Sequence, residues 1–163
     1  MGILGFLQRR KVHTAFGKYI SPEVIRRLLA KPDIVQPKVQ HFQFVVALFD
    51  EPDMQAISDL MGGVIRTLCA HNATVTSLSP CYLVGLLGVP FGEGNSAEVR
   101  RAVVDALLKE NGSRIRIAHG ECDGLVGNLG GPYRFTYDAA IPGFLAILKR
   151  LLDAKPGSAF EVS

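Results

Sequence analysis

The segment Ser77–Gly92, "SLSPCYLVGLLGVPFG", contains the strand around which the rest of the fold can be arranged. Its apolar run "CYLVGLLGV" is bounded by Pro and Gly, a pattern that is typical of a buried strand. The preceding stretch "ATVTSL", residues 73–78, has the composition of a second strand. The turn at Ser79-Pro80-Cys81 separates the two, so the segment predicts two neighbouring strands of one sheet.

A further strand and a helix precede this pair. In the stretch "HFQFVVALF", residues 41–49, alternate positions share one apolar face: Phe42, Phe44, Val46 and Leu48. The other face of this stretch is also mostly apolar, which predicts a central strand. The apolar residues of the stretch 54–70 follow helical spacing, so a helix is predicted directly after it.

The second half of the chain continues with a helix and two strands. "NSAEVRRAVVDALL", residues 95–108, predicts the helix, with Asn95 and Glu98 at the spacing of a capping box. "SRIRIAHG", residues 113–120, alternates Arg and Ile as a strand does. Asp123-Gly124 then predicts a tight hairpin turn into another strand at "LVGNLG".

The last strong element is "PGFLAILKRLLD", residues 142–153, a helix that is apolar almost all round. We expect it to be buried on more than one side. A short strand at "AFEVS", residues 159–163, follows it. The order of elements predicts an α+β fold of ferredoxin-like type, an antiparallel sheet with helices on one face. We expect residues 1–38 to form an N-terminal helical and linker segment and residues 39–163 to form the domain.

Length and composition fit one cytoplasmic domain. The chain has 163 residues and is 48% hydrophobic, which is enough for one domain with a core. Its 3 cysteines show no Cys-x-x-Cys spacing, so neither a zinc site nor a disulfide framework is predicted. A reducing, cytoplasmic compartment agrees best with this cysteine usage.

The positive charge is concentrated in the N-terminal segment. Residues 1–40 hold eight Lys or Arg against two acids, whereas the rest of the chain holds ten against thirteen. The apolar stretch "MGILGFL" is far shorter than the ~20 residues that cross a bilayer. A solvated basic helix explains the segment, and contact with the inner face of a membrane or with a partner is the alternative. Without a nucleic-acid motif or interleaved aromatic residues, DNA or RNA binding is not expected.

Four stretches together resemble the catalytic domain of the class III adenylate and guanylate cyclases, from about Phe16 to Leu151. They are "FGKYISPEVIRRLL", "VVALFDE", "TSLSPCYLVGLLGVP" and "VGNLGGPYRFTYDAAIPGFLAILKRL". The first is similar to the segment that, in many bacterial cyclases, couples an upstream sensor or membrane helix to the catalytic domain. The order and spacing of the four carry the resemblance, which implies the nucleotide cyclase fold.

In that family a ribose 3′-hydroxyl attacks the α-phosphate of a nucleoside triphosphate and releases pyrophosphate. The resemblance implies two metal ions, Mg²⁺ or Mn²⁺, held by two Asp residues. An Asn and an Arg of the partner subunit orient the ribose and stabilise the developing charge. The family's site forms between two chains, which implies a homodimer or a heterodimer with another cyclase-type domain.

The resemblance places altered residues at the metal-binding positions. The first metal Asp falls at Glu51, with Asp50 beside it, so a carboxylate is retained there. The second falls at Cys81, preceded by Pro80 where the family has Gly. A thiol is a poor ligand for Mg²⁺, which takes carboxylate oxygens, and Pro lacks the conformational freedom and the N–H of Gly. Cys81 is therefore a degenerate second ligand.

The positions for nucleotide and transition state are altered as well. The base-reading Lys of adenylate-specific members falls at Ser77, the Asn at Leu145 and the Arg at Lys149. Lys149 keeps a positive charge but lacks the two-pronged guanidinium that suits a phosphate, and Leu145 offers no polar group. Asp138, which follows Tyr137, matches a purine-contacting position of some adenylate-type members.

Structural roles compete with chemical ones at several of these residues. Asp50, Glu51 and Asp53 follow a strand, where capping of the next helix explains three acids as well as cation binding does. Cys81 opens an apolar strand, which predicts a buried small residue rather than a reactive thiol. The stretch "GNLGG" lacks the Lys of a phosphate-binding loop, so a hairpin turn explains it better.

The sequence therefore predicts a nucleotide cyclase-like domain that has lost catalysis. Loss of a single charge-stabilising donor lowers a rate by on the order of 10² to 10³, and here a metal ligand, the Asn and the Arg are all altered. We expect no cofactor. We expect the domain to act as a module for intracellular signal transduction that dimerises through the last helix and the strand after Cys81. Two alternatives stay open. One is an active adenylate or guanylate cyclase, a phosphorus–oxygen lyase with unconventional Mg²⁺ or Mn²⁺ ligands, and the other is a purine nucleotide sensor that uses Asp138.

Overall fold

The computed structural model describes residues 36–129 and 137–162, together with Arg26 and Ala30. Arg26 and Ala30 are helical. The remaining predictions for residues 1–35 lie outside the described residues, as do Gly130 and Gly131 of the turn predicted at "GNLGG".

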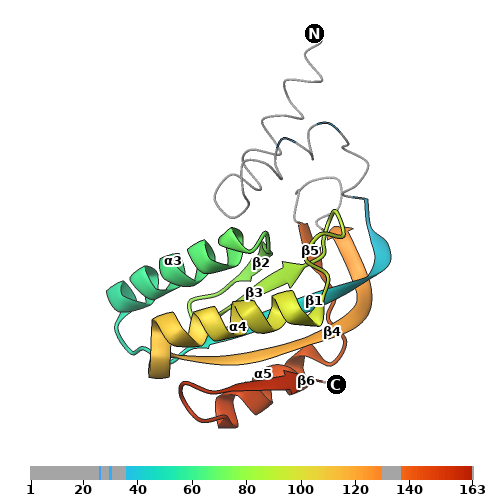
Figure 1. Ribbon diagram of the computed structural model, residues 1–163. Coiled ribbons are helices and arrows are strands. Elements are labelled where there is room, and N and C mark those ends of the chain that lie inside the picture. Colours follow the sequence, from blue (N-terminus) through green and yellow to red (C-terminus); the bar gives the residue numbers. More distant parts are fainter. Residues whose placement is uncertain (1–25, 27–29, 31–35, 130–136, 163) are drawn as a thin grey trace.

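The described chain forms a six-stranded sheet with helices on both of its faces (Figure 1). The strands are β1 (Lys38–Phe49), β2 (Thr74–Leu78), β3 (Tyr82–Leu87), β4 (Ile115–Asn128), β5 (Tyr137–Ala139) and β6 (Ala159–Val162). The α-helices are α3 (Met54–Ala70), α4 (Ala97–Asn111) and α5 (Phe144–Asp153), and a single 3₁₀ turn, η2 (Gly112–Arg114), follows α4.

The strands lie in the order β2-β3-β1-β4-β5, with β6 beside β4. All pairs are antiparallel except β4 with β6, which is parallel. The central position of β1 is confirmed, because β1 pairs with β3 on one side and with β4 on the other. The predicted α+β class and the ferredoxin-like order of strands are also confirmed.

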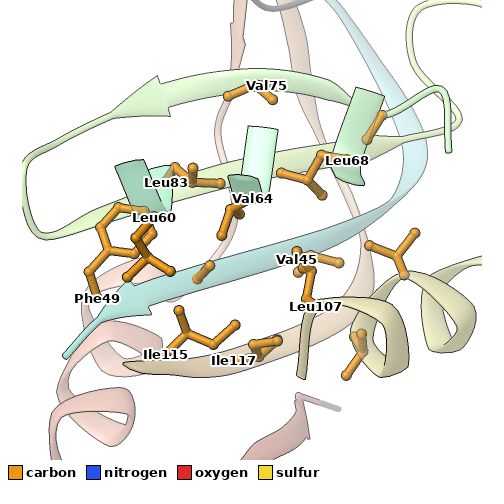
Figure 2. Close-up of a cluster of buried hydrophobic side chains, with 14 of the residues drawn as sticks. Val45, Phe49, Leu60, Val64, Leu68, Val75, Leu83, Leu107, Ile115 and Ile117 are labelled. Carbon is orange, nitrogen blue, oxygen red and sulfur yellow. The ribbon is translucent and has the colours of Figure 1, made fainter. Parts of the chain in front are cut away.

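The helices α3 and α4 cover one face of the sheet, and Figure 2 shows the core that they share with it. Val45 and Phe49 of β1 point into this core, where Leu68 of α3 and Leu107 of α4 are fully buried. A Cβ on Gly85 of β3 would lie 2.8 Å from the Leu68 side chain, so glycine lets α3 pack directly on the strand. Helix α3 has the bounds that the sequence predicts.

The helix α5 packs on the opposite face. The alternate residues of β1 that were predicted to share a face do so here, packing with Ile147 and Leu151 of α5: Phe42, Phe44, Val46 and Leu48. The prediction that the helices lie on one face is therefore correct for α3 and α4 and wrong for α5. The physical reason is that β1 is apolar on both faces, so each face needs a cover.

The predicted burial of α5 on more than one side is wrong within this chain. Ile147 and Leu151 are buried against the sheet, whereas Leu145 is 83% exposed and Leu152 is 64% exposed. The sheet covers one side of the helix, and no described element of the chain covers the other. The apolar side of α5 that carries Leu145 and Leu152, which was predicted to be buried, is thus exposed.

Two local predictions in the second half of the chain are also wrong. Asp123 and Gly124 do not form a hairpin turn, because β4 runs through them and pairs with β1 from Ile115 to Val126. A Cβ on Gly124 would lie 2.4 Å from the carbonyl oxygen of Ala140, so this glycine permits close packing rather than a turn. Helix α4 is capped by Ser96, whose Oγ accepts a hydrogen bond from Val99 N at 3.3 Å.

Asn95, which was predicted to cap α4, bonds elsewhere. Its Nδ2 donates to the carbonyl oxygen of His41 at 3.1 Å, and it therefore anchors the loop before α4 to β1. The start of the helix is shifted by one residue because both side chains are suitable caps, and the contact to β1 decides between them.

Candidate functional site

The ends of three strands meet at one edge of the sheet. Phe49 N, at the end of β1, donates to the carbonyl oxygen of Cys81 just before β3, at 2.8 Å. Asp50 N donates to the carbonyl oxygen of Arg114 just before β4, at 2.7 Å. The structure therefore brings Asp50, Glu51 and Cys81 to the same edge, as the resemblance implies.

Asp50 is held by an arginine on β4. Arg116 Nε donates to Asp50 Oδ2 at 2.5 Å, and Arg116 Nη2 donates to Asp50 Oδ1 at 2.8 Å. A carboxylate bound by two parallel N–H groups is among the strongest charge-assisted pairs in proteins. Arg116 Nη1 also donates to the carbonyl oxygens of Leu151 at 3.3 Å and Leu152 at 2.5 Å. One guanidinium thus ties Asp50 to the end of α5.

Glu51 is paired with a second arginine. Arg114 Nε lies 3.3 Å from Glu51 Oε2, and Arg114 Nη2 donates to the carbonyl oxygen of Ala56 at 3.4 Å. The third acid, Asp53, caps α3, because its Oδ2 accepts from Ala56 N at 2.8 Å. The capping role is therefore confirmed for Asp53, whereas Asp50 and Glu51 form ion pairs.

Cys81 is exposed, so the prediction that it is buried is wrong. It lies in a turn that is closed by a hydrogen bond from Ser79 N to the carbonyl oxygen of Tyr82, at 2.9 Å. Cys81 N donates to Ser79 Oγ at 3.3 Å. The apolar run becomes buried only from Leu83 onward, since the turn projects beyond the core.

The donors at this edge do not fit two divalent cations. Guanidinium groups already neutralise both carboxylates, and the third position offers a thiol, which Mg²⁺ disfavours. In the part of the chain that the structure describes, no group of three or more His, Cys, Asp or Glu side chains could hold a metal ion. In the structure, the carboxylates of Asp50 and Glu51 at this edge form ion pairs with Arg116 and Arg114.

Leu145 and Lys149 lie one turn apart on α5 and are both exposed. Leu145 belongs to the first turn of the helix, whereas Arg116 binds carbonyl groups of the last turn. At 1.5 Å per residue, the two are on the order of 10 Å apart along the helix. Within one chain, Leu145, the position of the family's Asn, therefore does not lie at the Asp50 edge.

Asp138 and Ser77 lie on β5 and β2, two strands that are not paired in the sheet but come close to one another. Asp138 lies on β5 opposite Gly127, next to the pair of Val126 with Lys38 at the start of β1. Its Oδ1 accepts from Ala139 N at 2.8 Å. Ser77 lies on β2, and its side chain is not among those described. The structure thus leaves Asp138 at the opposite end of β1 from Asp50.

The two arginines that dominate this edge were not singled out from the sequence. They belong to "SRIRI", where Arg114 and Arg116 alternate with Ile115 and Ile117. The isoleucines are fully buried, and Arg116, which lies between them on β4, emerges on the other face of the strand, where it meets Asp50. Arg114 precedes the strand, in η2, and reaches Glu51 and the start of α3. This alternation, next to three acids after a neighbouring strand, was the signal that could have identified them.

No protein-family model matches the chain, and no match was found among curated proteins. Solved structures do match. The catalytic core of a rhodopsin-guanylyl cyclase with converted specificity, solved in complex with ATPalphaS, has a TM-score of 0.64 at 12% identity, over 77% of this chain and 79% of that chain. This chain has the nucleotide cyclase fold.

Two further solved structures agree. The adenylyl cyclase CyaB from P. aeruginosa has a TM-score of 0.60 at 14% identity, over 76% of this chain and 78% of that chain. A monomeric crystal structure of a double mutant of the guanylyl cyclase domain of the RhoGC fusion protein, from the aquatic fungus Blastocladiella emersonii, has a TM-score of 0.57 at 14% identity, over 76% of this chain and 81% of that chain. Among the described residues of this cyclase-like domain, no helix is long and apolar enough to cross a bilayer.

Proposed function

We propose that this cyclase-like domain is non-catalytic and acts as a dimerising regulatory module in intracellular signal transduction. One observation carries the proposal: the carboxylates of Asp50 and Glu51, where the resemblance puts the first metal ligand, are paired with Arg116 and Arg114.

The charge balance at this edge opposes metal binding. Two-metal phosphoryl chemistry needs negative ligands that are free to neutralise the cations. Here each carboxylate faces a guanidinium that cannot be deprotonated in a protein. A metal ion would have to displace Arg116 from Asp50 and leave that guanidinium partly buried beside a second cation.

The groups that would stabilise a transition state are also missing. Leu145 stands at the Asn position and offers only methyl groups, and Lys149 offers a point charge in place of a planar fork. Because these changes accompany the altered metal positions, turnover by the family's mechanism is expected to be undetectable.

The exposed face of α5 supports dimerisation. Leu145, Leu148 and Leu152 follow the spacing of one helical stripe, of which Leu148 is half-buried and the other two are exposed. Apolar side chains that repeat along an exposed helix are typical of a surface that a partner covers. The strand after Cys81, which was predicted to share this interface, does not contribute, because Leu83–Leu87 of β3 are buried within the chain.

The direct test is an assay for cyclic nucleotide. The purified protein is incubated with ATP or GTP and with Mg²⁺ or Mn²⁺, and cyclic AMP and cyclic GMP are measured by mass spectrometry. No product above the protein-free blank is expected. Metal-dependent product that disappears in Glu51→Ala would overturn the proposal in favour of an active cyclase with unconventional ligands.

A calorimetric titration with ATP and GTP distinguishes the regulatory module from the remaining alternative, a purine nucleotide sensor. The regulatory module predicts no heat of binding in either titration. Binding that Asp138→Ala abolishes and Glu51→Ala leaves intact would instead identify a purine nucleotide sensor. Glu51 is a matched control because it is an acid at the opposite end of β1 from Asp138.

A further inference from the structure

A buried arginine joins three strands beneath α4. Arg100 is 1% exposed, and its Nη1 donates to Gln43 Oε1 of β1 at 2.5 Å. The same Nη1 lies 3.6 Å from Glu121 Oε2 of β4, and Nη2 donates to Glu161 of β6. Gln43 Nε2 in turn donates to Glu121 Oε2 at 2.7 Å. The guanidinium thus holds the last strand, β6, to the rest of the sheet.

The strand β6 is also attached by backbone pairing and by half-buried side chains, with Phe160 and Val162 packing on the α5 face and Ala159 on the other. It pairs with β4 over four residues, from Ile117 opposite Ala159 to Gly120 opposite Val162. On the α5 face, the guanidinium of Arg150 lies 4.0 Å from the centroid of the Phe160 ring. A four-residue strand at the margin of a sheet is among the elements that open at low free energy. The ion pair of Arg100 with Glu161 adds a polar link between β6 and α4 to this short strand.

His119 lies in the middle of this attachment. It is opposite Glu161 in the pairing of β4 with β6, and opposite Val45 in the pairing of β4 with β1. It is buried, and neither its Nδ1 nor the Nε of Arg100 has a hydrogen-bond partner. A neutral imidazole tolerates this position, whereas an imidazolium would add an unpaired donor and a second positive charge beside Arg100.

The charged groups around His119 come from three elements. They are Arg100, Arg101 and Asp105 of α4, Glu161 of β6 and, two residues along β4, Glu121. Burial lowers the pKa of His119, and Arg100 lowers it further; Glu161 and Asp105 act in the opposite direction. The folded domain therefore favours the neutral imidazole at neutral pH.

We propose that protonation of His119 in mild acid promotes detachment of β6 from the sheet. When His119 takes up a proton, local detachment of β6 lets both the imidazolium and the Arg100 guanidinium reach water, which weakens the repulsion between them. Detachment also uncovers the hydrogen-bonding edge of β4 at Ile117–Gly120, which is the kind of edge to which another strand can add. The domain thus has a built-in response to mild acid that does not depend on its catalytic state.

Hydrogen exchange of the β6 amides tests this proposal in the intact protein. Protection factors, corrected for intrinsic exchange, are measured from neutral pH to about pH 5.5, where histidine titrates. The protection of Phe160 and Val162 is expected to fall by up to about tenfold per pH unit, the limit for one proton, while that of β3 stays constant. In His119→Gln, the fall in β6 protection should be absent.

His41→Gln is the matched control, because His41 is an exposed histidine on the same two-strand ladder, 3.2 Å from Asp123. This variant should keep the full pH response of β6. If His119→Gln does not fold, the imidazole resonance of His119 in the native protein gives the same answer, since its titration must coincide with the loss of β6 protection. Constant β6 protection across the range, or an unchanged response in His119→Gln, would overturn the proposal.

Discussion

The two faces of the sheet are covered to different extents. On the face of α3 and α4, two helices bury a continuous apolar core, and Leu68 and Leu107 are fully enclosed. On the other face, the single helix α5 buries Ile147 and Leu151 but leaves Leu145 and Leu152 outside. The first face is complete within one chain, whereas the second leaves apolar side chains of α5 exposed.

The two faces also differ in how their helices are fixed. Helix α3 packs on the sheet through apolar side chains, and α4 adds the buried Arg100 to such packing. The end of α5 is instead fastened by Arg116, which also holds Asp50. Asp50, which lies beside the position of the family's first metal ligand, here has a structural role. Arg116 therefore connects the Asp50 edge with α5, the helix that carries the exposed leucines.

The largest expected difference between the faces is in the free energy of unfolding after a Leu→Ala substitution on each of them. Leu68→Ala should lower the free energy of unfolding by about 2–5 kcal/mol, because it opens a cavity in the closed core. Leu145→Ala should change it by less than about 0.5 kcal/mol, because that side chain is exposed. Urea unfolding of the two variants measures both values. Equal losses would show that the faces are not distinct.

A smaller effect is expected at the link between the site and α5. Asp50→Asn removes the partner charge of the partly buried Arg116, and it should lower the free energy of unfolding by about 1–3 kcal/mol. Asp59→Asn, at an exposed position of α3, is the control and should be nearly neutral. If Asp50 were an uncompensated metal ligand, its neutralisation would raise stability in the absence of metal, and that outcome would contradict the ion-pair assignment.

The pH dependence of stability is the next effect in size. The pKa of His119 is lowered in the folded domain, chiefly by burial and then by Arg100. Below about pH 6.5 the unfolded chain takes up a proton that the folded chain does not, so stability is present above this pH and is lost as the pH falls toward the folded pKa, by at most about 1.4 kcal/mol per unit. Urea unfolding of the native protein and His119→Gln across this range isolates the contribution. Parallel pH profiles would contradict it.

A substitution on the exposed side of α5 should have the smallest effect on stability and the largest effect on self-association. Leu145→Ser is expected to leave the free energy of unfolding within about 0.5 kcal/mol of the native value and to weaken self-association. Met54→Ser is the matched control, since Met54 is 67% exposed on α3. Sedimentation velocity at several concentrations compares the three proteins. Association that Met54→Ser weakens as much as Leu145→Ser would place the interface elsewhere.

Periodicity and turn chemistry predicted the elements with strong local signals. The strand β1 is apolar on both faces, and α3 has a helical stripe with Asp53 before it, so both were predicted with nearly the observed bounds. The strand β5 was missed because three residues carry no periodicity. The continuity of β4 was missed because Gly124 accommodates a close neighbour from another part of the chain, a reason that the local sequence does not contain.

The candidate site was predictable in its position but not in its bonding. The resemblance matched Asp50, Glu51 and Cys81 to the family's metal-binding positions, and the structure brings the three segments to one edge of the sheet. That Arg116 meets Asp50 depends on the register between β4 and β1, which pairs Leu48 with Arg116. Register is set by the packing of the whole sheet, and the sequence of either strand alone does not specify it.

The central claim is that arginines have taken over the carboxylates of a cyclase-like site. Titration with Mn²⁺, followed by the electron paramagnetic resonance signal of the free ion, tests it most directly. The account predicts no saturable binding to the native protein and no difference between it and Glu51→Gln. Stoichiometric binding to the native protein that is lost in Glu51→Gln would contradict the account.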